Sequence, residues 1–138
     1  MTKTLIILLV VLLCLMAVGG YFLLDNMFPE APPFECPDNG EILSISVKQP
    51  NGTEIDTNFA AFDGILQLLR SAEPTRQWSI QDYPSASSYY TIEIHTAARQ
   101  YRYYVYTEGI SMYIEHPYNG IYKTNQQIMD LIGSYFSE

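Results

Sequence analysis

The side chains that could carry chemistry are few in this chain of 138 residues, and they form no complete metal-binding set. His95 lies two residues after Glu93, so both project from the same face of a predicted strand, and Glu115 lies at the end of another strand. A zinc site needs three or four converging ligands, typically with Cys or further His. We therefore expect no metal site and interpret the two histidines as exposed, titrating groups.

Hydrolytic chemistry also lacks a recognisable arrangement in the sequence. No serine stands in a G-x-S-x-G motif, and Cys36 has no histidine near it along the chain. Asp82 and Glu115 are carboxylates of the kind that glycoside hydrolysis uses in pairs, but any acidic domain supplies such pairs by chance. We expect a protein without catalytic activity and without a cofactor.

Tyrosine is the outlying residue type, with twelve copies against a single tryptophan. Alternation along the predicted strands places these rings on both faces of a sheet. Rings on the face that the helices cover belong to the core, whereas rings on the other face offer a stacking platform for a sugar, a peptide or a partner protein. Alternatively, the tyrosines on this face are present only because aromatic residues favour β-strands, and the exposed rings bind no ligand. The candidate binding surface comprises Tyr89, Tyr104, Tyr106 and Tyr113.

The elements that position these residues follow from apolar periodicity. A period of two predicts strands, and steps of three and four residues predict a helix from Phe59, with Thr57 or Asn58 as N-cap, that ends before Pro74. A second helix is expected after the N-cap Thr124, with Gln127 completing a capping box. The predicted strands cover residues 43–48, 53–56, 89–96, 101–108 and 110–115.

This order, two strands, a helix, three strands and a helix, indicates an α+β domain. We expect an antiparallel sheet of about five strands with both helices packed on one face. Residues 75–88 are interpreted as an ordered loop that crosses the sheet, anchored by Trp78 and Ile80. The core face of the three later strands is expected to carry Tyr90, Ile92, Ile94, Tyr101, Tyr103, Val105, Met112 and Ile114.

The first part of the chain has a different character. Every residue from Leu5 to Leu24 is apolar, glycine or tyrosine, except Cys14. Twenty residues form a helix about 30 Å long, which matches the hydrocarbon thickness of a bilayer. A cleaved secretory signal and a lipoprotein signal at Cys14 are the alternatives. The apolar run continues past the cleavage-like Ala17-Val18-Gly19, which favours an uncleaved transmembrane anchor.

Flanking charges predict the orientation of this anchor. Lys3 precedes it and three acidic residues follow it, so the N-terminus is expected in the cytoplasm and the remainder outside. Prolines then indicate an extended spacer. The expected organisation is an anchor over residues 1–24, a Pro-rich spacer over 25–40 and an extracytoplasmic domain over 41–138, held at the cell membrane by a single span.

Charge limits the classes of partner. The chain carries a net charge of −8, and residues 36–138 hold twelve acidic against six basic side chains, which argues against nucleic acid. Cys36 cannot reach Cys14 across the bilayer face, so we expect either a free thiol or a disulfide between chains.

Three short motifs carry a resemblance to a known family. They are Ala72-Glu73-Pro74-Thr75, Gln81-Asp82-Tyr83-Pro84 and the segment from Glu115 to Tyr122. Over residues 41–133 the chain resembles a family of small extracytoplasmic domains of unknown function from Gram-positive bacteria, which follow a membrane anchor or a lipoprotein signal. The resemblance implies an architecture and a location, and it marks Asp82, Pro117 and Tyr118 as candidate binding residues. The alternative is structural: Asn119-Gly120 suits a turn with positive φ, and Asp82 can cap backbone amides.

Together these features predict a membrane-anchored binding or sensing module whose ligand is a cell-envelope protein or a cell-wall component. A second hypothesis is an immunity or inhibitor protein that uses its acidic surface to capture a basic secreted enzyme. A third is a small extracellular hydrolase.

Overall fold

The computed structural model describes residues 2–57 and 59–137 and divides the chain into two units, the first ending at Glu30 and the second beginning at Ala31. The side chains of residues 2, 57 and 59–62 are outside the description. The expected N-cap at Thr57 or Asn58 and the expected core contacts of Phe59 and Phe62 therefore lie outside the described residues.

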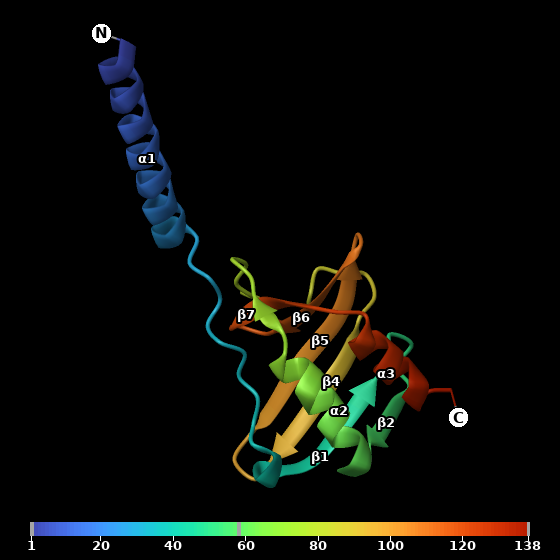
Figure 1. Ribbon diagram of the computed structural model, residues 1–138. Coiled ribbons are helices and arrows are strands. Elements are labelled where there is room, and N and C mark those ends of the chain that lie inside the picture. Colours follow the sequence, from blue (N-terminus) through green and yellow to red (C-terminus); the bar gives the residue numbers. More distant parts are fainter. Residues whose placement is uncertain (1, 58, 138) are drawn as a thin grey trace. The chain divides into compact units, whose positions relative to one another are not determined.

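The first unit contains α1 (Thr2–Met27), which Figure 1 shows as one uninterrupted helix. The most apolar 18 residues within Lys3–Met27 have a mean hydropathy of 2.8, and none of these residues is buried. By length and composition α1 can cross a membrane, a property that it shares with signal sequences.

The second unit is built on a seven-stranded antiparallel sheet with the strand order β2-β1-β4-β5-β6-β7-β3 (Figure 1). The three longest strands, β4, β5 and β1, lie side by side with β6, as expected for the alternating segments. The strands are β1 (Ile42–Lys48), β2 (Glu54–Thr57), β3 (Glu73–Pro74), β4 (Tyr90–Thr96), β5 (Gln100–Glu108), β6 (Ser111–His116) and β7 (Gly120–Thr124).

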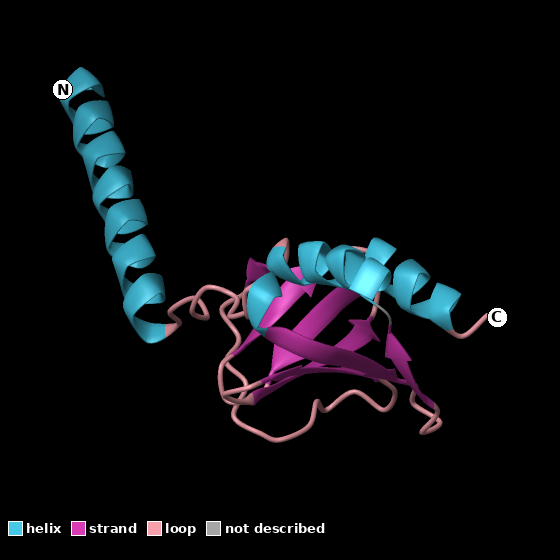
Figure 2. Cartoon of the chain, turned by 90° about the horizontal axis from the view of Figure 1, so that it is seen from below, coloured by secondary structure: helices cyan, strands magenta, loops and turns pink. Residues whose placement is uncertain are grey.

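Two helices, α2 (Phe59–Arg70) and α3 (Gln127–Tyr135), lie on the same face of the sheet (Figure 2). Ile65, Leu66 and Leu69 of α2 and Ile128 and Ile132 of α3 are buried in one core with the strands. The predicted core face is confirmed, although Met112 is buried outside this cluster and Tyr90 packs at its margin. The strand residues of the core are Ile45, Val47, Ile92, Ile94, Tyr101, Tyr103, Val105, Ile114 and Tyr122.

The sheet has two strands more than the five we expected. Residues 120–124, predicted as a turn and a helix cap, form β7 along β6, and β3 pairs with β7 through Glu73 and Lys123. Thr124 therefore does not cap α3, and its buried hydroxyl has no hydrogen-bond partner among the described residues. Instead, Oδ1 of Asn125 accepts a hydrogen bond of 3.0 Å from the amide of Gln127. Two residues of β3 are too few to show a period, and β7 has adjacent apolar residues at Ile121 and Tyr122 that break the alternation.

The alternation predicted for β1 fails at its first residue. The register between β1 and β4 shifts between Ile42 and Ser44, where the strand is irregular. Ile42 is buried as a result, whereas Leu43 is 63% exposed. Side chains along a strand point alternately to the two faces of the sheet. An irregularity of one residue therefore moves the side chains that precede it to the opposite faces.

Residues 31–37 belong to the folded domain and not to a spacer. The Phe34 ring lies 5.0 Å from that of Tyr103 and 4.9 Å from that of Tyr122. Ala31 is buried, and a Cβ atom on Gly120 would lie 2.4 Å from the Ala31 Cβ, so only glycine permits this approach. The domain therefore starts about ten residues before the expected boundary near residue 41, because Phe34 packs the proline-rich segment against the core. The short 3-10 helix η1 (Asn39–Glu41) leads from this segment into β1.

Candidate functional site

Residues 75–89, here called the crossing loop, run across the sheet face opposite the two helices (Figure 2). The backbone fixes its start: the amide of Thr75 donates to the Ile121 carbonyl (3.1 Å), and the amide of Ile121 donates to the Gln77 carbonyl (3.0 Å). The predicted crossing is confirmed, but the predicted anchors are wrong, because Trp78 and Ile80 are exposed.

Small and polar side chains anchor the crossing loop instead. Ser79 and Pro84 are buried. The Ser79 hydroxyl donates a 2.6 Å hydrogen bond to Oε1 of Glu115, whose side chain is 2% exposed. Glu115 faces the loop because it pairs across the sheet with Tyr104, on the face away from the helices. Sequence reasoning missed this contact, and the one available signal was an acidic residue within a strand of otherwise apolar alternation.

The crossing loop covers most of the expected tyrosine platform. Tyr104 and Tyr106 are 1% and 6% exposed, so they do not form an open stacking surface. The rings of Tyr83 and Tyr89, from the loop, lie 5.8 and 5.1 Å from the Tyr104 ring. Tyr113 is partly exposed, 6.0 Å from Tyr106. The prediction places these tyrosines on the correct face of the sheet, but it is wrong that they are exposed. The crossing loop covers them as a second layer, which strand alternation cannot reveal.

Of the remaining candidates, Asp82 and Tyr118 contact each other, and Pro117 precedes Tyr118 in the turn between β6 and β7. The exposed Tyr118 hydroxyl donates a 2.7 Å hydrogen bond to Oδ1 of Asp82, and this bond raises the pKa of Tyr118. Asp82 thus links the loop to the β6–β7 turn, in which Pro117 is half-buried. Tyr118 itself takes the positive φ of this turn (59°), so the expectation for Asn119-Gly120 is wrong.

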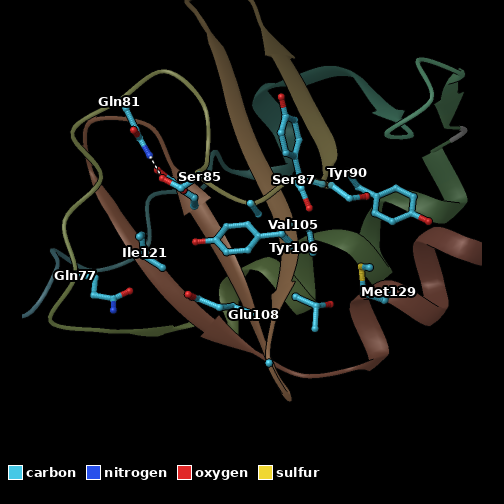
Figure 3. A pocket seen from close by; sticks show the side chains of 16 residues that line it. Gln77, Gln81, Ser85, Ser87, Tyr90, Val105, Tyr106, Glu108, Ile121 and Met129 are labelled. Atoms are coloured by element: carbon cyan, nitrogen blue, oxygen red, sulfur yellow. Dashed lines mark hydrogen bonds between the residues drawn. The ribbon is translucent and has the colours of Figure 1, made fainter.

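A pocket of about 650 Å³ lies between the crossing loop and the sheet. Its wall includes β5 beyond Val105, where β4 has ended and no longer pairs with β5. In the view of Figure 3 the Tyr106 ring lies in the middle, with Gln77 and Ile121 towards one side and Tyr90 and Met129 towards the other. Gln81 donates a 3.0 Å hydrogen bond to the Ser85 hydroxyl within the loop. This volume is typical of sites for small molecules.

The pocket is acidic and aromatic. Its sixteen lining residues include Glu108, Glu115 and three tyrosines, and none of them is Lys, Arg or His. Burial raises the pKa of Tyr106, and the neighbouring carboxylates Glu115 and Glu108 raise it further. The phenol therefore stays protonated and is a hydrogen-bond donor at neutral pH.

The residues considered for metal binding are dispersed. Nε2 of His95 lies 3.9 Å from Oε2 of Glu93, but Oε1 of Glu93 accepts a 2.7 Å hydrogen bond from Arg102. Glu115 is bound to Ser79 instead. Within the described ranges no three His, Cys, Asp or Glu side chains are placed to hold a metal ion together.

Two further side chains considered for chemistry lie away from the pocket. His116 packs against Phe34 and Tyr103 on the helix-covered face, so its interpretation as an exposed group is wrong, and burial lowers its pKa. Cys36 is partly buried against the core and not in an open spacer. Burial raises the pKa of the Cys36 thiol, although Arg70 opposes this effect. A raised pKa disfavours the reactive thiolate.

Fold and pocket define an α+β domain with one helix-covered sheet face and one loop-covered face that holds a ligand-sized cavity. Residues 30–123 match the DUF5301 family, described as a domain of unknown function (DUF5300), and the chain belongs to this family. The matched region begins one residue before the second unit.

A solved structure shares this architecture. It is described as the NMR structure of the protein from Ruminococcus gnavus, with a TM-score of 0.62 and 30% sequence identity, and the match covers 73% of this chain and 98% of that chain. No curated protein matches the chain.

Proposed function

We propose that this protein is a membrane-anchored, extracytoplasmic binding module that takes its ligand in the pocket beneath the crossing loop and performs no catalysis. The observation that carries the proposal is the pocket itself. It has a volume of about 650 Å³, lies between the crossing loop and the sheet, and has Tyr106 and the buried Glu115 in its lining. Sites for small ligands combine an aromatic wall with a few placed polar groups in this way.

The absence of catalysis is proposed from the positions of the groups that could react. His116 lies on the opposite sheet face from Glu115, and Asp82 binds Tyr118 on the outer side of the loop. A general base must come within hydrogen-bonding reach of the proton that it removes, and these three groups do not share a cavity. The arrangement suits recognition more than group transfer.

Location rests on α1. A helix of this length and hydropathy supports a single span, with Lys3 on the cytoplasmic side and the domain in the cell envelope of a Gram-positive bacterium. Protease added to intact protoplasts tests the orientation. We expect the domain to be digested from outside, whereas protection in protoplasts and digestion only in inverted vesicles would contradict the proposal.

The pocket is tested by filling it from its exposed side. Ser87 is exposed and lines the pocket, so Ser87→Trp adds bulk there without entering the core, and Ser71→Trp is a matched control on an exposed serine outside the lining. The full-length protein in detergent is incubated with an envelope extract, and retained compounds are identified by mass spectrometry.

We expect the unmodified protein and Ser71→Trp to retain the same compound, and Ser87→Trp to lose it. Equal retention by both tryptophan variants, or no retention by the unmodified protein, would contradict a ligand in this pocket.

Charge favours a second candidate, the capture of a basic secreted enzyme. Residues 36–138 carry a net charge of −6, which accelerates association with a cationic partner. This candidate predicts tight binding of one protein that weakens steeply with salt and does not respond to Ser87→Trp, because a protein interface would use the outer surface.

A further inference from the structure

We propose that the pocket binds a linear aliphatic polyamine, held by Glu108 and Glu115 at its two ends and by the Tyr106 ring between them. This inference rests on the proposed function, because it names the class of ligand for the same pocket. Three features carry it: the order of the three side chains along the sheet, the burial of Glu115 in the lining, and the absence of Lys, Arg and His among the described lining residues.

The sheet places the two carboxylates on opposite sides of Tyr106. Tyr104, Tyr106 and Glu108 alternate along β5 on the loop-covered face, and Glu115 of β6 pairs with Tyr104. Glu108 lies four residues after Tyr104, the β5 residue that pairs with Glu115, so the two carboxylate positions are about 13 Å apart along the strand. Tyr106 lies midway. A ligand with one positive charge can meet only one of these carboxylates, whereas a chain with amino groups spaced along it can meet both.

Glu115 is the stronger of the two contacts because it is buried in the lining of the pocket. Ser79 donates to Oε1, and the Tyr106 phenol lies within hydrogen-bonding reach of the same carboxylate. The Glu115 side chain is 2% exposed and lines the pocket, so a ligand in the pocket meets this carboxylate away from bulk solvent. A carboxylate can accept several hydrogen bonds, and an ammonium group donates three. A charged donor within the pocket would complete the coordination of Glu115.

The rest of the lining favours a cation and an alkyl chain. The lining residues include no Lys, Arg or His, and the nearest cations in sequence, Arg76 and Lys123, are not part of the lining. The phenol of Tyr106 is neutral, so its ring offers an electron-rich face to ammonium groups and an apolar surface to methylenes. Serine and glutamine side chains from the crossing loop supply acceptors for the remaining N–H groups.

The test is calorimetric titration of the full-length protein in a nonionic detergent. The probes are spermidine, cadaverine and pentanediol, the last being the neutral analogue of cadaverine. We expect spermidine to bind more tightly than cadaverine, and pentanediol not to bind. Affinity for spermidine should fall at least about tenfold on Glu115→Gln, which removes a buried charge, and about two- to fivefold on Glu108→Gln, which removes an exposed one.

Glu41→Gln is the matched control, because it removes one exposed carboxylate at the end of η1, outside the pocket lining. It should leave the affinity unchanged. If Glu115→Gln proves unfolded by circular dichroism, the comparison of Glu108→Gln with Glu41→Gln decides the question alone.

Equal binding of pentanediol and cadaverine, or equal losses in Glu108→Gln and Glu41→Gln, would overturn the polyamine assignment. If Ser87→Trp abolishes retention of an envelope compound but polyamines do not bind, the binding module stands and its ligand class is different. If neither experiment gives binding, both proposals fail.

Discussion

At the scale of single residues, two buried hydroxyl groups on the loop-covered face differ in their hydrogen bonding. The Ser79 hydroxyl donates to Glu115, whereas the buried Tyr104 hydroxyl makes no hydrogen bond of good geometry among the described residues, although Arg102 lies beside it. Removing a donor from a buried carboxylate leaves that group unsatisfied and costs about 1–3 kcal/mol. Removing a hydroxyl that has no partner relieves a desolvation cost.

We therefore expect opposite effects from two deletions of a single oxygen. Ser79→Ala should lower the free energy of unfolding by about 1–3 kcal/mol, and Tyr104→Phe should leave it unchanged or raise it slightly. Urea unfolding followed by tyrosine fluorescence measures both, with Ser85→Ala, an exposed serine of the same loop, as control. A Tyr104→Phe variant as unstable as Ser79→Ala would show that Tyr104 has a partner in solution.

His116 predicts a dependence of stability on pH. Its pKa is lowered in the folded protein because burial penalises the charged imidazolium, so the unfolded chain binds the proton more strongly. The contribution of the neutral imidazole is complete above the unfolded pKa of about 6.5 and is lost as pH falls towards the lower folded pKa.

Urea unfolding at pH 7.5 and pH 5.0 measures this effect. The free energy of unfolding should fall between these values in the unmodified protein and fall less in His116→Gln. His95→Gln, which removes the other imidazole, is the control and should keep the decrease. An unchanged decrease in His116→Gln would assign the pH dependence to other groups.

At the scale of elements, the crossing loop is held to the sheet at separate points. Backbone hydrogen bonds with Ile121 fix its start, Ser79 fixes its middle, and the Tyr118–Asp82 hydrogen bond ties its outer side to the β6–β7 turn. The last of these is exposed, so it contributes little to global stability and acts on the position of the loop.

Tyr118→Phe should therefore loosen the loop without unfolding the domain. We expect faster amide exchange in residues 79–86 and an unchanged urea midpoint, measured by hydrogen exchange with mass spectrometry. Asp82→Asn keeps an acceptor for the phenol and should have a smaller effect. If both variants exchange as slowly as the unmodified protein, the buried anchors alone hold the loop.

Elements of this fold differ in how far the sequence predicts them. The central strands are predictable because alternation over six or more residues reports one buried face, as Ile92 and Ile94 do in β4. The strands β3 and β7, of two and five residues, are not predictable in this way. They form because β7 pairs with β6 and β3 pairs with β7. Long-range pairing, and not local pattern, fixes those edges.

The candidate site was predictable in its residue types and not in its shape. Alternation correctly places Tyr104, Tyr106 and Tyr113 on one face, away from the helices. What covers that face depends on contacts between residues far apart in the sequence, such as the hydrogen bond between Ser79 and Glu115, which are 36 positions apart. Neither residue belongs to a periodic pattern that marks the other, so the platform expected from the strands becomes the wall of a pocket.

At the scale of the whole molecule, the boundary between α1 and the domain decides which part of the chain can fold alone. Among the residues that the structure describes, the core cluster begins at Ala31 and includes none from α1. The structural relative, covered over 98% of its length by 73% of this chain, is a protein of about the size of this second unit. A fragment of residues 31–138 should therefore fold without α1.

A fragment that starts at residue 41 should be much less stable. It lacks Phe34, whose ring packs on Tyr103 and Tyr122, and both phenols lose their carbonyl acceptors, Glu35 (2.7 Å) and Pro32 (2.9 Å). Loss of a fully buried aromatic ring costs about 3–5 kcal/mol, and loss of the partly buried Phe34 ring costs less than this. Each of the two lost hydrogen bonds adds about 0.5–1.5 kcal/mol, against a total stability of about 5–15 kcal/mol for a typical domain.

Thermal unfolding of the two fragments followed by circular dichroism measures this difference. The midpoint of 41–138 should lie at least about 10 °C below that of 31–138, since 1 kcal/mol shifts a domain of this size by about 4–8 °C. Phe34→Ala within 31–138 should reproduce most of the loss, whereas Pro33→Ala, at an exposed position of the same segment, should not. Equal midpoints for both fragments would return residues 31–40 to the status of a spacer, and the fold would then begin with β1.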